Sequence, residues 1–226
     1  MTDPPPNRAP FADAAIVYVV LMATIVTLKR LAGFGFVGRN LLFLAALVFL
    51  SVPIVAMRHR GESLDSFGMT SRNAWREILF ALLAAGVIFP PFVVGYHLYQ
   101  KVWFHHAPLF NMPKDVWRLA SIHLLLVALP EEFFYRGYIQ GKLKRVLPGG
   151  LSLMGARAAP AIVLTAALFA LGHFIVDFRP MRLGVFFPAL LFGWMKEKTG
   201  TVTAPIVFHA LSNVFMATLE KTYFHP

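Results

Sequence analysis

The chain has 226 residues, of which 58% are hydrophobic and only 14% are charged. Soluble domains carry about 25% charged residues, so this composition excludes an ordinary soluble domain and indicates a protein that crosses a membrane several times. The net charge of +10 does not point to nucleic acid, because the basic residues lie mostly between apolar runs, where they meet lipid headgroups. Cysteine is absent, which excludes disulfides, thiol catalysis and a cysteine zinc site.

The N-terminal half of the chain contains three predicted membrane spans. Residues 1–10 are rich in proline and are predicted to be a flexible tail, and residues 11–226 to be a single membrane-embedded helical domain. The three spans are predicted at 11–28, 40–57 and 78–99. Two basic residues follow the first span in place of a small-residue cleavage site, so we expect a retained span and not a signal peptide.

The C-terminal half contains four further apolar segments. They are predicted at 116–139, 158–178, 181–195 and 202–219. The segment 181–195 is short for a full crossing and can be tilted, broken or re-entrant. The predicted fold is therefore all-α, a polytopic transmembrane helix bundle with about seven spans, between six and eight. Basic residues are divided almost evenly between the two sides, so the positive-inside rule does not orient the chain.

A cluster of ionisable residues lies near the end of the fourth predicted span. Glu131 and Glu132 are adjacent, and Arg136 follows. Residues four apart share a helical face, so Glu132 and Arg136 are predicted to pair, while Glu131 lies about 100° around the helix and is left unpaired. An unpaired carboxylate in an apolar environment can act as a base. Pro130 lacks an N–H and favours a helix irregularity here. The alternative is a purely structural ion pair at a helix end.

Two other spans carry polar residues in apolar surroundings. His173 lies in the fifth span, and His209 and Asn213 lie four residues apart on one face of the seventh. His209 and Asn213 can each present an N–H to one point, as in an oxyanion hole. His173 and Glu131 can hold a water between them. Each residue alone is more often structural, since polar side chains commonly bridge membrane helices, but the set on three spans predicts a site.

These polar clusters have the order and spacing of a known set of motifs. They are Glu131-Glu132-x-x-x-Arg136, Phe169-x-x-x-His173 and His209-x-x-x-Asn213. The motifs resemble those of the CAAX-protease and bacteriocin-processing (CPBP) family of intramembrane glutamate-type endopeptidases, which is related to the eukaryotic prenyl-protein protease. The resemblance covers residues 116–219, the protease motif region. It implies an all-helical membrane bundle with endopeptidase activity in a membrane-embedded cavity.

The resemblance also implies a role for each motif residue. It implies that Glu131 is the general base and that His173 helps to place the attacking water. It implies that His209 and Asn213 stabilise the oxyanion. The remaining motif residues are expected to be supporting: Glu132, Arg136 and Phe169.

Zinc is the alternative to this metal-free mechanism, because a glutamate and two histidines can bind it. Glu131, His173 and His209 are then the only ligands in reach. His123 lies eight residues before Glu131, about 12 Å along a regular helix, and is expected to be out of reach. If His209 faces the oxyanion beside Asn213, only two ligands remain. We therefore expect no cofactor and no metal site.

The predicted function is hydrolysis of a peptide bond near the C-terminus of a membrane-associated protein or peptide by glutamate-activated water. The expected partners are this substrate and the lipid bilayer, and the expected location is the bacterial cytoplasmic (inner) membrane as a multi-pass protein. One alternative is a non-enzymatic bacteriocin-immunity or scaffold protein of the same fold. Another is a proton-coupled transporter that uses Glu131 and His173 as a relay, although no repeat of discontinuous helices is recognisable.

Overall fold

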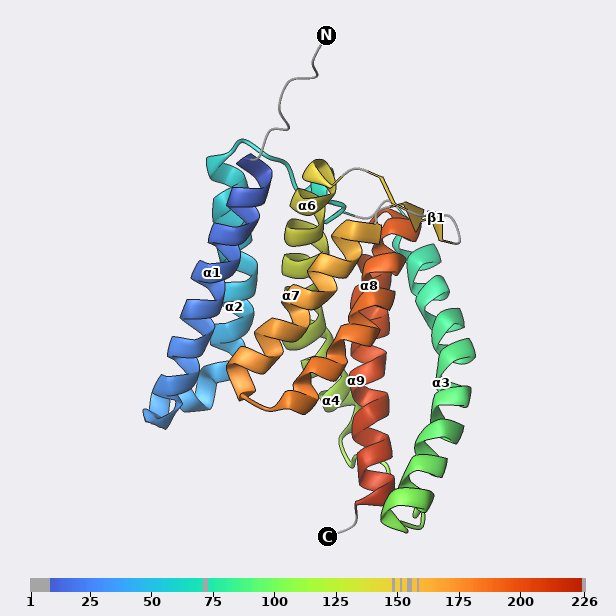
Figure 1. Cartoon of the computed structure of the whole chain (residues 1–226). Coiled ribbons are helices and arrows are strands. Elements are labelled where there is room, and N and C mark those ends of the chain that lie inside the picture. The colour runs from blue at the N-terminus through green and yellow to red at the C-terminus, as the bar shows by residue number, and fades with distance from the viewer. Residues whose placement is uncertain are drawn as a thin grey trace.

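The computed structural model describes residues 9–70, 73–147, 149–150, 152–153, 156–157 and 159–224. Almost all of them are helical (Figure 1). The strands of this described part are β1 (Ser152–Leu153) and β2 (Ala156–Arg157), a short antiparallel pair. The predicted all-α membrane bundle is thus confirmed. The predicted tail at 1–10 lies outside the described residues up to residue 8, and the first helix begins at Ala9.

Four helices of the described part are long and apolar enough to cross a membrane, with mean hydropathy between 1.8 and 2.4. They are α1 (Ala9–Arg30) with its extension η1 (Leu31–Gly33), α2 (Gly35–His59), α3 (Ala74–Phe104) and α7 (Ala159–Asp177). Between 11% and 39% of the residues in their apolar windows are buried within the bundle. Such outward-facing apolar surface suits a lipid environment, where helices satisfy their own backbone hydrogen bonds. The turn η2 (Asp65–Phe67) lies between α2 and α3.

The fourth predicted span is one continuous helical run whose hydrogen-bond pattern changes along its length. Its segments are α4 (Val116–Ile122), η3 (His123–Ala128), α5 (Leu129–Glu132), η4 (Phe133–Ile139) and α6 (Gln140–Val146). Both η3 and η4 are π-helical, with i→i+5 hydrogen bonds. This form is rare in proteins overall, and where it occurs it is often at a functional site. They flank the segment that contains Pro130 and both glutamates. The predicted irregularity is confirmed, in keeping with the missing N–H of Pro130.

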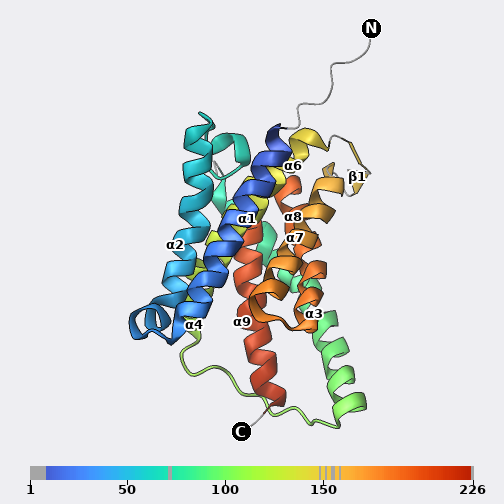
Figure 2. The same ribbon diagram turned by 60° about the vertical axis from the view of Figure 1, so that its left-hand side comes forward.

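The last three elements surround this run. The sixth predicted segment is divided between η5 (Pro180–Val185) and α8 (Phe186–Thr199). The 14 residues of α8 rise only about 21 Å, which is less than the roughly 30 Å hydrocarbon core of a bilayer. Through η5, α8 forms a hairpin with α7 (Figure 1). The final helix, α9 (Thr203–Tyr223), packs against α3 and α8 and against the η3 part of the central run (Figures 1 and 2).

Two apolar clusters hold the bundle together, and the motif residue Phe169 belongs to the first of them. One joins α1, α2, the central run and α7, and the other joins α3, α8 and α9. Helix α7 approaches the central run closely at Gly172, where an added Cβ would lie 2.5 Å from the hydroxyl of Tyr135. The small residue therefore lets the helix of the second motif pack directly on the helix of the first.

Candidate active site

Glu132 and Arg136 form the predicted ion pair at the centre of the bundle. Glu132 Oε1 lies 3.1 Å from Arg136 Nη1, and both side chains are fully buried. Arg136 Nη2 also donates to the carbonyl of Ala189 in α8 at 3.2 Å. The guanidinium carbon lies 4.5 Å from the ring centroid of Phe169 and 5.2 Å from that of Phe192. Arg136 thus joins the central run to α7 and α8, which supports its predicted supporting role.

Glu132 has a second partner that the sequence does not reveal. His209 Nδ1 lies 2.9 Å from Glu132 Oε1, and the His209 ring stacks on Phe192 with centroids 4.9 Å apart. A carboxylate only accepts, so His209 donates its Nδ1–H to Glu132. In neutral His209 the other nitrogen, Nε2, is then an acceptor. It becomes a donor only in the imidazolium form.

Glu131 differs from its neighbour in having almost no partners. Its Oε2 is buried and has no hydrogen-bond partner within the described chain, and its side chain is 17% exposed. The one charged group that the described residues place within 4.0 Å is His209, whose Nε2 lies 4.0 Å from Glu131 Oε2. Arg136 therefore leaves Glu131 unpaired, as predicted. An open carboxylate beside an imidazole nitrogen is an arrangement that can hold and deprotonate a water.

His173 is oriented by its own helix. Its Nδ1 lies 3.0 Å from the carbonyl oxygen of Phe169, one turn earlier in α7. A carbonyl only accepts, so Nδ1–H donates and Nε2 of the neutral ring remains an acceptor. The ring of Phe169 contacts that of His173, with centroids 4.4 Å apart, and lies edge-on to His209 at 6.1 Å. Phe169 therefore has a ring contact with each of the two histidines, and its supporting role stays a prediction.

Asn213 follows His209 by four residues on α9 and is partly buried. The two side chains share a face of the helix, as predicted. None of the hydrogen bonds between described residues uses the side chain of Asn213. Its amide group is therefore available to a ligand.

His123, which was expected to be out of reach, has a buried ring nitrogen without a hydrogen-bond partner in the described part of the chain. It begins η3 and interacts electrostatically with Glu131 and His209. In a regular α-helix, the eight residues from His123 to Glu131 rotate by two full turns and about 80° more, so the two side chains point in different directions. The π-helical segment lowers the rotation per residue, which returns His123 toward the face of Glu131. The sequence signal that could have revealed this is Pro130, which disturbs the helix between them.

No three His, Asp or Glu side chains of the described residues lie close enough to hold a metal ion. The residues predicted as alternative zinc ligands have other roles in this geometry. His209 uses Nδ1 for Glu132, and His173 uses Nδ1 for a backbone carbonyl, which leaves one nitrogen on each ring. The expected absence of a cofactor stays a prediction, for which an experiment is given below.

The fold and the site define an integral membrane helix bundle with a buried glutamate–histidine cluster. Residues 113–215 match the family model described as type II CAAX prenyl endopeptidase Rce1-like. This segment, which contains all three motifs, is therefore similar to Rce1-like endopeptidases, and the predicted resemblance to CAAX proteases is confirmed. No curated protein and no solved structure matches the chain.

Proposed function

We propose that this protein is an intramembrane endopeptidase that cleaves a peptide bond near the C-terminus of a membrane-associated protein or peptide. The observation that carries the proposal is the unequal pairing of two adjacent carboxylates. Glu132 has one oxygen, Oε1, held by Arg136 and His209, whereas the described residues form no hydrogen bond to the Glu131 carboxylate. The match to the Rce1-like family supports peptide hydrolysis as the reaction.

In the proposed reaction Glu131 accepts a proton from a water whose oxygen attacks the scissile carbonyl carbon. His173 Nε2, left as an acceptor by the Phe169 carbonyl, accepts the other water hydrogen and so orients the molecule. The attack yields a tetrahedral intermediate. Protonated Glu131 then gives its proton to the leaving amine, the C–N bond breaks, and the carboxylate is regenerated.

The oxyanion of this intermediate needs donors, and the hydrogen bond to Glu132 determines which form of His209 can provide one. Because Nδ1–H is committed to Glu132, Nε2 donates only when His209 is an imidazolium ion. The amide N–H of Asn213 is the second donor. The proposed reaction therefore uses Glu131 as a carboxylate and His209 as an imidazolium ion.

The substrate and the location follow from the same proposal. A site inside an apolar bundle is reached most directly by a substrate that is itself held at the membrane, and the matching family is described as a CAAX prenyl endopeptidase. We further propose the bacterial inner membrane as the location. Membrane proteomics of a strain that carries Glu131→Ala would identify the C-termini whose processing changes.

The direct test uses the purified full chain in proteoliposomes and an internally quenched farnesylated CAAX peptide. We expect Glu131→Gln to lower kcat by about 10²–10⁴-fold, since the amide keeps the shape but cannot accept the proton. Its melting temperature in detergent should equal that of the wild type. The matched control is Glu220→Gln, an exposed glutamate on α9, which should keep full activity.

Two results would contradict the proposal. Substantial peptidase activity of Glu131→Gln would remove Glu131 from the role of base. A wild-type protein that cleaves neither the farnesylated peptide nor a panel of unmodified C-terminal peptides would favour the immunity or scaffold alternative. Proton uptake into proteoliposomes by such an inactive protein would favour the transporter.

A further inference from the structure

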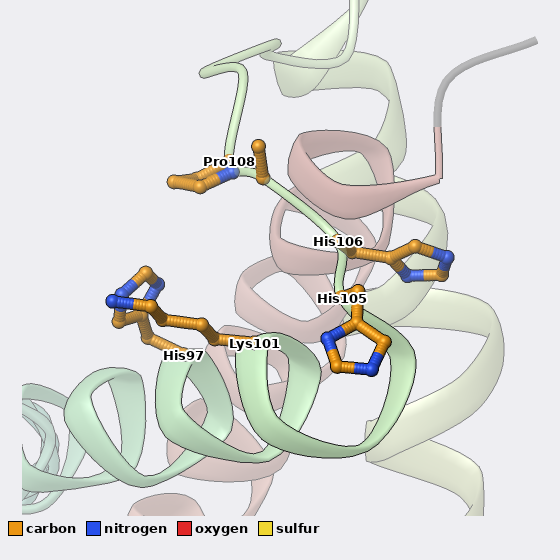
Figure 3. Close-up of a pocket in the computed structure, with 6 residues that line it drawn as sticks. His97, Lys101, His105, His106 and Pro108 are labelled. Atoms are coloured by element: carbon orange, nitrogen blue, oxygen red, sulfur yellow. The ribbon is translucent and has the colours of Figure 1, made fainter.

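A pocket of about 450 Å³ lies at the end of α3 and in the segment that follows it (Figure 3). It is separate from the three motifs, none of whose residues lines it. The lining residues are His97, Lys101, His105, His106, Ala107 and Pro108. The helix ends in a left-handed residue, His105, with φ of 55°, and this turn brings the following segment back over the last helical turns. The chain thereby forms an open hollow lined by three imidazoles and one ammonium group.

The polar groups of the pocket are suited to an anion. His97 and Lys101 are four residues apart and share a face of α3. No carboxylate lines the pocket. Glu220 of α9, which interacts electrostatically with Tyr96 of α3, is not among the lining residues. In Figure 3 the side chains of His97, Lys101 and His105 are drawn below the segment that contains Pro108.

Two hydrogen bonds hold the imidazole rings in place. His97 Nδ1 lies 2.7 Å from the hydroxyl of Tyr223 in α9, and His106 Nδ1 lies 3.0 Å from Oε1 of the buried Gln100. Each bond uses only Nδ1. The Tyr223 hydroxyl can donate to Nδ1 of His97, which leaves Nε2–H of His97 as a positioned donor for a ligand, whereas Gln100 Oε1 accepts from Nδ1–H of His106, whose neutral Nε2 is then an acceptor.

The position of the pocket relative to a bilayer limits what can bind. The 31 residues of α3 rise about 46 Å, which exceeds the roughly 30 Å hydrocarbon core and extends through the headgroup region. The side chains beside the pocket are large, exposed and aromatic, as is typical of membrane–water interfaces: Trp103, Phe104 and Phe110. The pocket therefore lies at the depth of lipid phosphates.

We propose that this pocket binds the phosphate group of an anionic phospholipid headgroup. Lys101 supplies the point charge that phosphate binding commonly uses, and His97 and His105 supply N–H donors. The flanking aromatic side chains contact the start of the acyl chains, which a free phosphate lacks. A metal ion is a poor alternative, because Lys101 repels cations and no three His, Asp or Glu groups in the described part of the chain meet closely enough.

The experiment titrates the purified full chain in detergent with dioleoyl phosphatidic acid, dioleoyl phosphatidylcholine or inorganic phosphate, and native mass spectrometry counts the bound molecules. We expect one saturable phosphatidic acid site. Lys101→Gln should weaken it about fivefold, the usual effect of one cation near an anionic lipid surface. The double variant His97→Gln/Lys101→Gln should weaken it more than about tenfold, and Lys101→Arg should restore binding.

The matched control is Arg30→Gln, which removes an exposed cation from the end of α1. Its binding of phosphatidic acid should equal that of the wild type. Equal loss in Arg30→Gln and Lys101→Gln would show a general charge effect and overturn the site. Equal affinity for phosphatidylcholine, or for inorganic phosphate, would overturn the assignment to an anionic lipid. Because the readout is lipid binding, it is independent of peptidase activity.

Discussion

Two clusters of ion pairs on the same helical run differ in their access to water. The central cluster contains Glu132 and Arg136, whose side chains are 0% exposed. The end cluster contains Lys142, with a side chain 2% exposed, and its partners Asp13 and Glu62, at 12% and 15%. Charges without water depend entirely on their protein partners, whereas partly exposed ones are also solvated. The central cluster is therefore expected to be sensitive to any single change, and the end cluster to be tolerant.

The clusters also connect different parts of the chain. In the end cluster Lys142 of α6 reaches Asp13 of α1 at 3.1 Å and Glu62, just after α2, at 2.8 Å. These contacts attach the N-terminal helices to the segment that is similar to Rce1-like endopeptidases. The central cluster instead joins the central run to α8 and α9. One cluster builds the site, and the other attaches the helices outside the matched segment.

The largest effect is expected from Arg136→Ala, which breaks the central cluster. It leaves the buried carboxylate of Glu132 without its guanidinium partner, which costs about 3–5 kcal/mol of folding free energy. Peptidase activity should then fall with the fraction of folded protein. Glu132→Ala should behave alike, since it leaves Arg136 without its partner. Thermal melting in detergent is the measurement. Variants that melt like the wild type but are inactive would place Glu132 or Arg136 in the chemistry itself.

A smaller effect is expected from Lys142→Met in the end cluster. Asp13 keeps Arg60 as a partner and Glu62 keeps Arg145, so no carboxylate is left unpaired. The loss should be about 1.5–3 kcal/mol, the worth of hydrogen bonds to charged groups, with peptidase activity retained in the folded protein.

The control for this variant is Lys144→Met, whose exposed side chain pairs with Glu197 and should matter less. Melting temperatures of the two variants can be compared directly with that of Arg136→Ala. A loss for Lys142→Met as large as that for Arg136→Ala would contradict the distinction between the clusters.

A still smaller effect on stability is expected from the titration of Glu197 near the end of α8. Burial raises the pKa of Glu197, but Lys196, Lys144 and Gln140 together outweigh it, so the pKa lies below its usual value of 4.5. Ionised Glu197 therefore stabilises the folded state above pH 4.5, and this contribution is lost as the pH falls through the lower folded-state value. The melting temperatures of wild type and Glu197→Gln should converge on acidification. A difference that is constant with pH would rule out this contribution.

No effect is expected from metal removal. EDTA should leave peptidase activity and melting temperature unchanged, and the purified protein should contain no stoichiometric zinc. The physical reason is that His209 uses Nδ1 for Glu132, and no three His, Asp or Glu groups of the described residues lie close enough to hold a metal. Loss of activity on chelation, with recovery on adding zinc, would make Glu131 a ligand and not a base.

The sequence alone determined the features that depend on neighbours along the helix. The apolar runs predict a membrane helix bundle, because length and hydropathy are local properties. The spacing of Glu132 and Arg136 predicts their ion pair, and the chemistry of Pro130 predicts an irregular helix beside them. The unpaired state of Glu131 follows from the same helical geometry.

Only the tertiary structure decided the contacts between residues far apart in the chain. The hydrogen bond from His209 to Glu132 joins residues 77 positions apart, and Lys142 meets Asp13 across 129 positions. Such contacts depend on how helices rotate and pack, and one-dimensional spacing does not specify this. The π-helical form of the turns beside Pro130 was also seen only in the structure, since the proline predicts an irregularity without specifying its type.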